Sequence, residues 1–460
     1  MSLFSSLTTS ARSLEAQRMG LEVTGQNIAN VNTPGYSRRV VDFASVAPEA
    51  GGGVDVESVR ATRDRLLDKR LQQEVPAERR EAAMADSLSV VETSLGAAGQ
   101  SLDLGLSNFF DSFSRLAETP TSSVARQEVL LQGETLAQTF QEMARRLESS
   151  QVDTDRSIRS TVDEVNALAQ RIATLNQSMG GPQDASQTHL QDEQAGLVRK
   201  LSELVDISVI DRENGGGVDI SFGNGRSLVI GDQARTLLAT PTGPSGLSTL
   251  SVAGNAITSE ITGGKLGGLL NVRDVNIPDY MNQLDTLAYG VADRVNTLHT
   301  AGFTQTGVDA GNFFVQPGAV AGAARAMAVD PAIAGDVRLI AASLPDPVSG
   351  TASDGDNQTA TAIARLRDAR VLNGGTATFS DGWSQLVYRV GRDTQTAKAE
   401  QSSREEIVRQ VDTLRDEVSG ISLDEETMHL LKYQRAYEAN ARFFSAINSA
   451  IDTLIQTMGR

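Results

Sequence analysis

Apolar side chains recur at helical spacing at both ends of the chain. Near the N-terminus one stripe returns every seven residues, at Leu7, Leu14, Leu21 and Ile28. Near the C-terminus the apolar positions follow a spacing built from threes and fours, at Leu423, Leu430, Tyr437, Ala441, Phe444, Ile451, Ile455 and Met458. A heptad repeat keeps one stripe turned toward a partner helix. These stripes predict an assembly interface in which the terminal helices pair with each other, with other copies, or with both.

The first helix is predicted to end in a cluster of turn-forming residues. Asn27, Asn30 and Asn32 are of a type that tolerates left-handed backbone, which commonly closes a helix. The run Thr33-Pro34-Gly35-Tyr36 then places proline and glycine at the second and third positions of a turn. We therefore expect the chain to turn sharply here, with Gly35 at positive φ.

Between the two ends, long helical segments alternate with short β-like ones. Extended sequence runs from Arg39 to Val46, and helical spacing then dominates from about Glu57 to Asp206. Short strands framed by glycine-rich turns follow to about Gly264. A helix is predicted from Pro278 to His299. Residues 301–375 are rich in Gly, Ala, Asp and Ser, which we interpret as a second β-containing excursion.

The predicted fold is mainly α with β excursions, an α+β chain of several domains. Helix resumes after Phe379 and runs to the end, with one break at Ser419-Gly420. The terminal helices pair as a coiled coil at one end of a long helical bundle, and β-rich insertions project outward. The predicted units are a terminal axial assembly domain of residues 1–45 and 420–460, a helical bundle body of 46–206, 276–300 and 376–419, a β-rich excursion of 207–275, and an outer β-containing excursion of 301–375.

Composition narrows the classes of function. The chain has no cysteine, so disulfides, thiolate zinc sites and Cys nucleophiles are excluded. Its three histidines, His189, His299 and His429, are far apart in sequence. The net charge of −17 argues against nucleic acid or an anionic membrane surface as a partner. Most of this charge lies in the body, because residues 1–40 hold four Arg and two Glu, and residues 421–460 hold four basic and five acidic groups.

The N-terminal segment does not have the character of a cleaved signal peptide. Arg12, Glu15, Arg18 and Glu22 interrupt the first thirty residues, which therefore lack a continuous apolar core. No apolar stretch is long enough to span a bilayer. We expect a chain that either stays in the cytoplasm or is exported by a route that needs no cleaved signal.

Motifs that would carry chemistry are weak. The glycine-rich runs at residues 223–227 and 263–268 lack the features of a nucleotide loop and favour tight turns or packing. The acidic pairs Asp192/Glu193 and Asp424/Glu425 point in diverging directions on a helix. We therefore predict no catalytic, cofactor-binding or metal-ligating residues. A cell-wall hydrolase on a helical scaffold, the alternative from another class, would have to use scattered aspartates: Asp309, Asp330, Asp336 and Asp346.

Three segments resemble one protein family. The run from Asn27 to Arg38, Asn-Ile-Ala-Asn-Val-Asn-Thr-Pro-Gly-Tyr-Ser-Arg, resembles the N-terminal motif of bacterial flagellar axial proteins. Its ending, through Ser37 and Arg38, is similar to the hook-associated protein 1 branch, whereas rod and hook subunits usually carry Lys after a Thr-x-Gly-aromatic run. Residues 419–426 and 431–441 are similar to that branch's closing helix. The run Gly267-Gly268-Leu269-Leu270, with Arg273-Asp274, Val295-Asn296 and His299, is similar to its middle region.

The resemblance implies a structural subunit of a small ring between the flagellar hook and filament. It also implies an extracellular location reached through the flagellar type III apparatus, without cleavage of a signal peptide. The implied partners are other copies, the hook protein, the second junction protein (hook-associated protein 3) and an export chaperone, with no cofactor, nucleic acid or membrane. A hook or distal-rod subunit is the alternative within the same superfamily. Residues 301–375 are short beside the outer domains of some relatives, so functions of those domains are not carried over.

Overall fold

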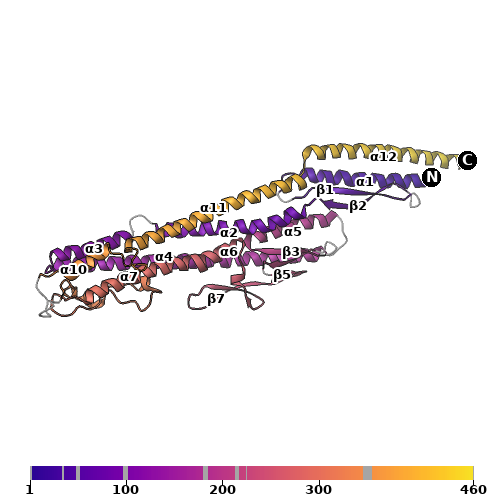
Figure 1. Ribbon diagram of the computed structural model, residues 1–460. Coiled ribbons are helices and arrows are strands. Elements are labelled where there is room, and N and C mark those ends of the chain that lie inside the picture. Colours follow the sequence, from indigo (N-terminus) through magenta and orange to yellow (C-terminus); the bar gives the residue numbers. More distant parts are fainter. Residues whose placement is uncertain are drawn as a thin grey trace.

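Two helices from opposite ends of the chain lie side by side at one tip of an elongated molecule, α1 (Leu3–Ala29) and α12 (Leu423–Met458) (Figure 1). We call them the terminal helix pair, and the rest of the molecule beyond the first hairpin the body. The computed structural model describes residues 3–33, 36–47, 52–96, 102–179, 185–212, 217–223, 225–344 and 355–458. The pairing of the termini and the mainly helical class, both predicted from the sequence, are confirmed.

A β-hairpin leads from the terminal helix pair into the body. Strands β1 (Arg39–Ser45) and β2 (Val54–Ala61) pair antiparallel, and the register shifts between Asp42 and Phe43. Helix α2 (Arg65–Leu95) begins after the hairpin, with the Asp64 carboxylate accepting the backbone N–H groups of Leu66 and Leu67. The predicted helix start near Glu57 is therefore wrong, because that part of the chain completes the hairpin.

Long helices form the body, and their buried faces follow the apolar spacing of the sequence. Helix α11 (Phe379–Ser419) packs along α2, and α3 (Leu102–Glu118) and α4 (Ser123–Ser178) complete the bundle. Helix α4 is one continuous helix of 56 residues. Helix α11 begins with a capping box, in which Thr378 and Asp381 each bond the other's backbone.

The middle of the chain adds a second core against the C-terminal half of α4. The sheets are antiparallel, one of β3 (Ile207–Asp211), β4 (Val218–Phe222), β5 (Ser227–Ile230) and β6 (Gln233–Ala234), the other of β7 (Leu237–Pro241), β8 (Ser248–Val252) and β9 (Asn255–Ala256). Alternate residues of β4 and β8 are buried, as expected for strands with one face on a core. Three further elements cover this core: α5 (Ala185–Leu204), a short 3-10 turn (Thr258–Glu260) and α6 (Gly264–Asn271). We call the two sheets, with these elements and the core between them, the β unit.

Glycines of the 263–268 run serve packing. Helix α6 crosses α2 so closely that a Cβ added to Gly268 would lie 2.3 Å from the carbonyl oxygen of Arg80. Gly264 has a φ of +68°, a backbone angle that residues other than glycine rarely adopt. The run is thus a site of backbone-to-backbone contact between two helices.

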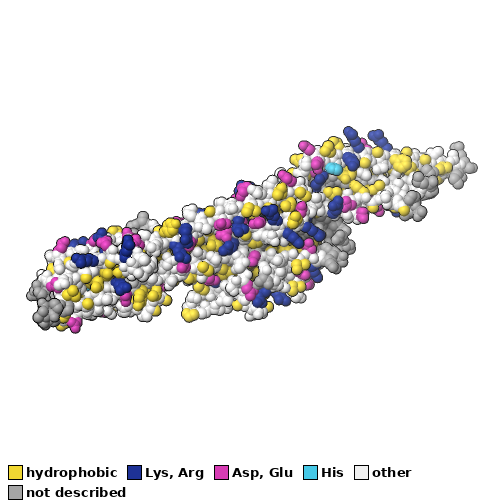
Figure 2. All heavy atoms as spheres, viewed as in Figure 1, with side chains coloured by type: hydrophobic (Ala, Val, Ile, Leu, Met, Phe, Trp, Pro, Cys, Tyr) yellow, Lys and Arg dark blue, Asp and Glu magenta, His cyan; other side chains and the backbone are white. Residues whose placement is uncertain are grey.

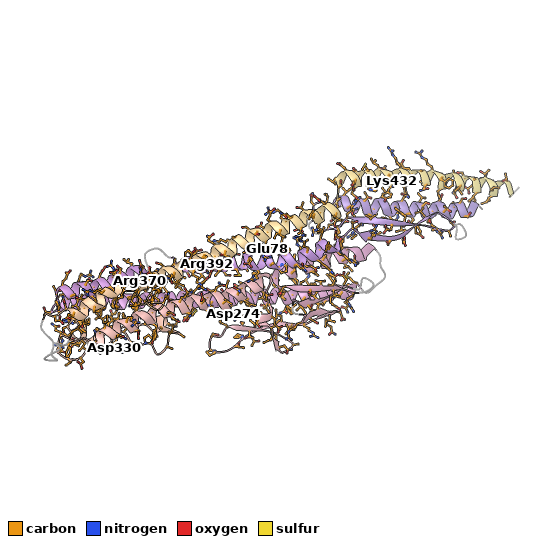
Figure 3. The ribbon with its side chains drawn as sticks, viewed as in Figure 1. Glu78, Asp274, Asp330, Arg370, Arg392 and Lys432 are labelled. Carbon is orange, nitrogen blue, oxygen red and sulfur yellow. The ribbon has the colours of Figure 1, made fainter. Side chains whose placement is uncertain are left out.

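A buried ion-pair network joins the β unit to the helices. A π-helical segment (Val272–Asn276) follows α6 and leads into α7 (Ile277–Thr300). Arg273 donates from Nη1 to Asp155 Oδ1 of α4 at 2.6 Å and to the Ser248 carbonyl of β8. Its Nε and Nη2 donate to Asp274, the neighbouring residue in the π-helical segment (Figure 3). The side chains of Arg273 and Asp155 are almost fully buried, so the network fixes how the β unit sits on α4.

Residues 301–375 differ from the prediction of an outer β-containing excursion. Their described part contains short helices and isolated β-bridges but no strand: α8 (Ala323–Ala326), α9 (Pro331–Gly335), α10 (Gln358–Ala364) and 3-10 turns at Val337–Leu339 and Arg365–Arg367. Phe313 and Phe314 are buried in the core formed by α3, α4 and α7. A Cβ on Gly133 would lie 2.8 Å from the Phe313 ring. Two aromatic anchors thus hold this segment, which we call the cap, against the bundle.

His299 links the cap to α7 through both ring nitrogens. Its Nε2 accepts the N–H of Ala341 at 2.9 Å, so Nδ1 carries the proton and donates to the Gly311 carbonyl at 2.7 Å. Burial lowers the pKa of His299 to about 4, and the nearby Arg126 acts in the same direction. Since the unfolded histidine has a pKa near 6.5, acid protonates the unfolded chain first.

We expect the cap and its bundle to lose about 3 kcal/mol of stability as the pH falls from 6.5 to 4, through His299 alone. The folded pKa is lowered, so this contribution is complete above pH 6.5 and is lost toward pH 4. Trp383, the chain's single tryptophan, lies in the same core and reports its unfolding by fluorescence in urea. His299→Gln should reduce the stability at pH 7 and flatten the difference between pH 7 and pH 4.5. An unchanged difference would contradict the assignment.

Candidate assembly site

The terminal helix pair is antiparallel and closely packed. Gly20 of α1 lies against Tyr433 of α12, and Asn27 lies against Glu426, so the residue numbers run in opposite directions. A Cβ built on Gly20 would lie 3.0 Å from the Tyr433 ring. The same ring faces Phe43 of the hairpin, with 6.0 Å between ring centroids. One aromatic side chain therefore joins α1, α12 and β1.

The face that α1 buries within the subunit is not the predicted leucine stripe. Apart from Val23, the most buried positions of α1 are small or polar, namely Ser10, Ala16, Gly20, Thr24 and Asn27. The predicted stripe residues Leu7, Leu14, Leu21 and Ile28 are half-buried, at the flank of this face. Small residues allow α12 and the hairpin to approach α1 closely, which turns the larger leucines partly toward solvent.

The predicted stripe of α12 divides into two groups. Leu430, Ala441, Phe444 and Ile451 are half-buried in the subunit. Leu423, Tyr437 and Ile455 are exposed, Leu423 by 48% and Ile455 by 64%. The Met458 side chain lies outside the described residues. The stripe is therefore only partly covered by α1 within one copy.

Asn27 is the centre of a buried hydrogen-bond network at the inner end of the pair. Its Nδ2 donates to the Arg39 carbonyl at 2.9 Å and to Glu426 Oε2 at 3.0 Å. Its Oδ1 accepts the Arg39 N–H and the Tyr36 hydroxyl, both at 3.0 Å. Burial raises the pKa of Tyr36, which keeps the hydroxyl protonated for this bond. All four hydrogen-bonding positions of one amide are used, and they join α1, β1 and α12.

Arg38 ties the N-terminal motif to the start of α12. Its Nε donates to Glu426 Oε1 at 2.7 Å, and its Nη1 lies 3.1 Å from Glu425 Oε2. Its backbone N–H bonds the carbonyl of Ser419, the last residue of α11. The Glu426 side chain is buried, so Arg38 and Asn27 together compensate its charge. The two covalent connections between the terminal helix pair and the body are thus bonded to each other.

A second carboxylate anchors the hairpin to the body. Asp192 of α5 accepts Arg39 Nη2 at 2.8 Å and Arg63 Nη2 at 2.7 Å. The Arg39 guanidinium also lies over the Tyr36 ring, 5.1 Å from its centroid. Arg39 opens β1 and Arg63 follows β2, so one body side chain holds both ends of the hairpin.

The remaining motif residues have smaller roles within the subunit. Asn30 donates to the Gln26 carbonyl and accepts the Thr33 hydroxyl, which closes the end of α1. Asn32 is exposed, and the Ser37 hydroxyl accepts Arg63 Nε at 3.3 Å. Pro34 and Gly35 lie outside the described residues, so the predicted positive φ of Gly35 stays a prediction.

Sequence reasoning missed the partners that make this network. No partner is predicted for Glu426 or Arg63. Arg39 is predicted only to begin the extended segment, and Asp192 is named only as half of the acidic pair with Glu193. A signal was present in Glu426, an acidic residue in the first turn of α12 that lies on the buried side of this helix. The identity of its partners, 388 and 399 residues earlier, has no local signature.

Gly20→Val should loosen the terminal helix pair by about 1–3 kcal/mol, because the added methyl groups displace the Tyr433 ring. Hydrogen exchange of α1 and α12 in the isolated subunit should accelerate, while α4 stays protected. Gly25→Val is the matched control, since nothing lies within 4 Å of a Cβ there. Equal acceleration in both variants would mean that the valine acts through helix propensity alone.

The aspartates proposed for a hydrolytic site do not gather. Asp330 accepts the Ala332 N–H at the start of α9, and Asp336 bonds Arg338. Asp309 is exposed, and Asp346 lies outside the described residues. Within the residues that the structure places, no three His, Asp or Glu side chains group closely enough to hold a metal ion. Among the described helices, none combines the length and apolarity needed to cross a bilayer.

Three family models match the chain, one at each end and one in the body. The model described as "Flagella basal body rod protein" matches residues 7–36, and "Flagellar basal body rod FlgEFG protein C-terminal" matches 415–457. The model described as "Flagellar hook-associated protein FlgK helical domain" matches residues 88–314. Rod models at the two paired ends define the class, an axial protein of the bacterial flagellum. The model of the body is specific to one branch of that class.

Whole-length relatives agree with the body model. Flagellar hook-associated protein 1 of Bacillus subtilis (strain 168) is 28% identical, over 100% of this chain and 99% of the relative. The Escherichia coli (strain K12) protein of the same name is 27% identical, over 98% and 99%. The solved structure of the hook junction protein FlgK from Burkholderia pseudomallei has the same fold, with a TM-score of 0.67 at 16% identity, and covers 76% of this chain and 100% of its own. The chain is thus similar over its whole length to flagellar hook-associated protein 1, and its body matches the helical-domain model of that family.

Proposed function

We propose that this chain is a structural subunit of the flagellar hook–filament junction, and that copies of it form a ring that adapts the hook to the filament. The similarity to flagellar hook-associated protein 1 supports the junction role. The observation that carries ring formation is the terminal helix pair, whose apolar stripe is only partly covered within one copy. Apolar side chains left at the surface along a helix are typical of a surface that another protein covers.

The outer face of α12 extends this surface. Its exposed apolar side chains are Leu423, Met428, Leu431, Tyr437, Phe443, Leu454 and Ile455. Figure 2 shows hydrophobic side chains along the terminal helix pair. Lys432, on the same helix, is also exposed (Figure 3). An α12 that contacts α1 on one side and neighbouring copies on the other has the two apolar faces that a ring subunit needs.

The partners follow from the position in the flagellum. Below the ring we propose contact with the hook protein, and above it with the second junction protein, hook-associated protein 3. Export would pass through the type III apparatus with an export chaperone and without removal of the N-terminal segment. No cofactor is required for this role, since the ring acts through shape and apolar contact.

Immuno-electron microscopy of intact flagella tests the proposal. Antibody against the body should label one band between hook and filament, and cells without the gene should carry hooks but no filaments. Labelling along the whole hook or within the rod would instead favour the hook or distal-rod alternative. The mass of the protein released from sheared flagella should include Arg12 and Arg18, and a mature start beyond them would contradict export without cleavage.

A further inference from the structure

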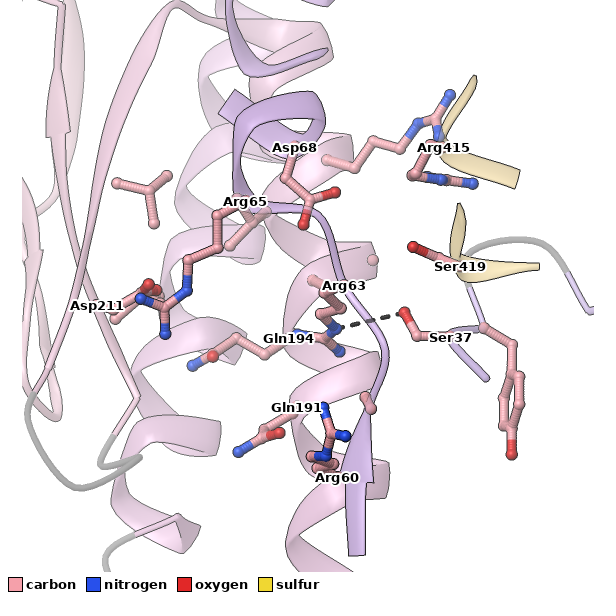
Figure 4. A pocket seen from close by; sticks show the side chains of 18 of the residues that line it. Ser37, Arg60, Arg63, Arg65, Asp68, Gln191, Gln194, Asp211, Arg415 and Ser419 are labelled. Carbon is pink, nitrogen blue, oxygen red and sulfur yellow. Dashed lines mark hydrogen bonds between the residues drawn. The ribbon is translucent and has the colours of Figure 1, made fainter. Parts of the chain in front are cut away.

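A cavity of about 840 Å³ opens at the neck between the terminal helix pair and the body. Strand β2 and the residues after it form one wall, the first turns of α2 a second, α5 and the β3–β4 edge a third, and the end of α11 the last (Figure 4). Its volume lies in the range of sites that bind a ligand or a short peptide segment. The network of Asn27, Arg38 and Glu426 lies beside it and does not fill it.

The residues that line the cavity are more basic than the chain as a whole. Seven Lys or Arg side chains line it against four Asp or Glu, in a chain of net charge −17. Five of these cations already pair with carboxylates, namely Arg60, Arg63, Arg199, Arg212 and Arg415. Arg65 and Lys69 are exposed on the first two turns of α2, where the helix dipole is positive. Neither makes an ion pair with any residue that the structure describes. Two cations at the wrong end of a helix leave an electrostatic cost that an anion would remove.

One buried hydroxyl in the wall lacks an acceptor. Ser419 is 5% exposed, and its Oγ has no hydrogen-bond partner within the described residues. Figure 4 shows the hydroxyl on the cavity side of α11, facing the region of Ser37 and Arg63. A buried polar group without a hydrogen-bond partner destabilises the fold. A carboxylate oxygen in the cavity would accept this hydroxyl.

We propose that this cavity is a socket for carboxylate side chains of a second copy of this chain. The proposal rests on the ring proposed above and on charge complementarity, because a second copy of this acidic chain brings many carboxylates to the neck. Carboxylates match Arg65, Lys69 and the unpartnered Ser419 hydroxyl in charge and hydrogen-bonding type. A polymer of phosphodiesters is disfavoured as occupant, because the rest of the molecular surface would repel it.

The absence of cysteine makes a single-site cross-linking test clean. Cells first assemble flagella that contain the Lys69→Cys variant. The intact flagella are then labelled with a benzophenone maleimide and irradiated. We expect a cross-linked dimer of this chain, with the second attachment mapped by mass spectrometry to a peptide rich in Asp or Glu. Cross-links only to another flagellar protein, or only within one chain, would overturn the proposal.

A charge reversal in the same cavity is the matched test of chemistry. Adding Arg65→Glu to the labelled chain should lower the dimer yield about tenfold, because it sets a carboxylate against carboxylates. Arg294→Glu, an equally exposed site on α7 far from the neck, should leave the yield unchanged. Equal loss from both changes would mean that net charge, and not this socket, governs the contact.

The same flagella separate the two proposals. If antibody labels the junction but Lys69→Cys gives no dimer, the socket fails and the junction role stands. If antibody finds no label at the junction, the ring fails and the socket fails with it. Label at the junction together with the dimer supports both.

Discussion

Cells whose only copy of this chain carries Leu14→Asp or Phe444→Asp should make hooks that retain no filament. Both side chains are half-buried in the subunit and lie on the predicted assembly stripes of α1 and α12. Burying each one fully contributes about 1.5–3 kcal/mol, and a carboxylate removes this gain and adds its own desolvation cost. Because every subunit of a ring repeats the change, the losses accumulate around the ring. Filament protein should therefore appear in the medium.

Arg18→Asp is the control for this prediction. The Arg18 side chain is 58% exposed and pairs with Glu15 on the same helix, at a type of surface contact worth little. Filament retention should be close to that of the unchanged chain. Trp383 fluorescence should show an unaltered body core in all three variants. Equal failure of Arg18→Asp and Leu14→Asp would show that the stripe is not the contact surface.

Arg273→Met should destabilise the β unit by about 3–5 kcal/mol, the largest stability effect that we expect from a single change in the body. Methionine fills a similar volume but leaves the fully buried Asp155 with fewer partners for its charge. Arg159 and Ser248 still bond this carboxylate, so the loss should stay within that range. Hydrogen exchange of β7 and β8 should accelerate more than that of α3.

Arg226→Met is the comparison within the same unit. Arg226 pairs with Glu260 at 2.7 Å, and both side chains are partly exposed, so this change should destabilise the β unit far less than Arg273→Met. If both variants exchange at the same rate, the buried network is not what holds the β unit on α4.

The regular elements of the fold could be predicted because their signals are local. The three–four spacing of α4 and the alternation in β4 follow directly from which side chains face a core. The cap could not be predicted in this way, since Phe313 and Phe314 find their place only against helices remote in sequence. A stretch rich in Gly, Ala, Asp and Ser has weak preferences for either regular structure, and two buried rings decide its path.

The same distinction between local and remote signals holds for the assembly site. The heptad stripe predicts that α1 has an apolar partner, but the depth of burial depends on Gly20, which lets Tyr433 approach the backbone. The Asn27 motif predicts a turn, whereas its main role in the subunit is to bond Glu426 across 399 residues of sequence. Spacing along a helix gives its apolar face, and small residues decide which face is closest to the partner.

Helix α4 gives the body a mechanical property. Its 56 residues span about 84 Å without a break. The first half contributes Phe140 and Leu147 to the core under the cap, and the second half contributes Ile158 and Val165 to the β unit. Two separately packed cores therefore share one continuous helix. A torque applied to the cap end passes along this helix to the β unit as rotation of a stiff rod, and bending is left to the neck, where two connections and one carboxylate join it to the terminal helices.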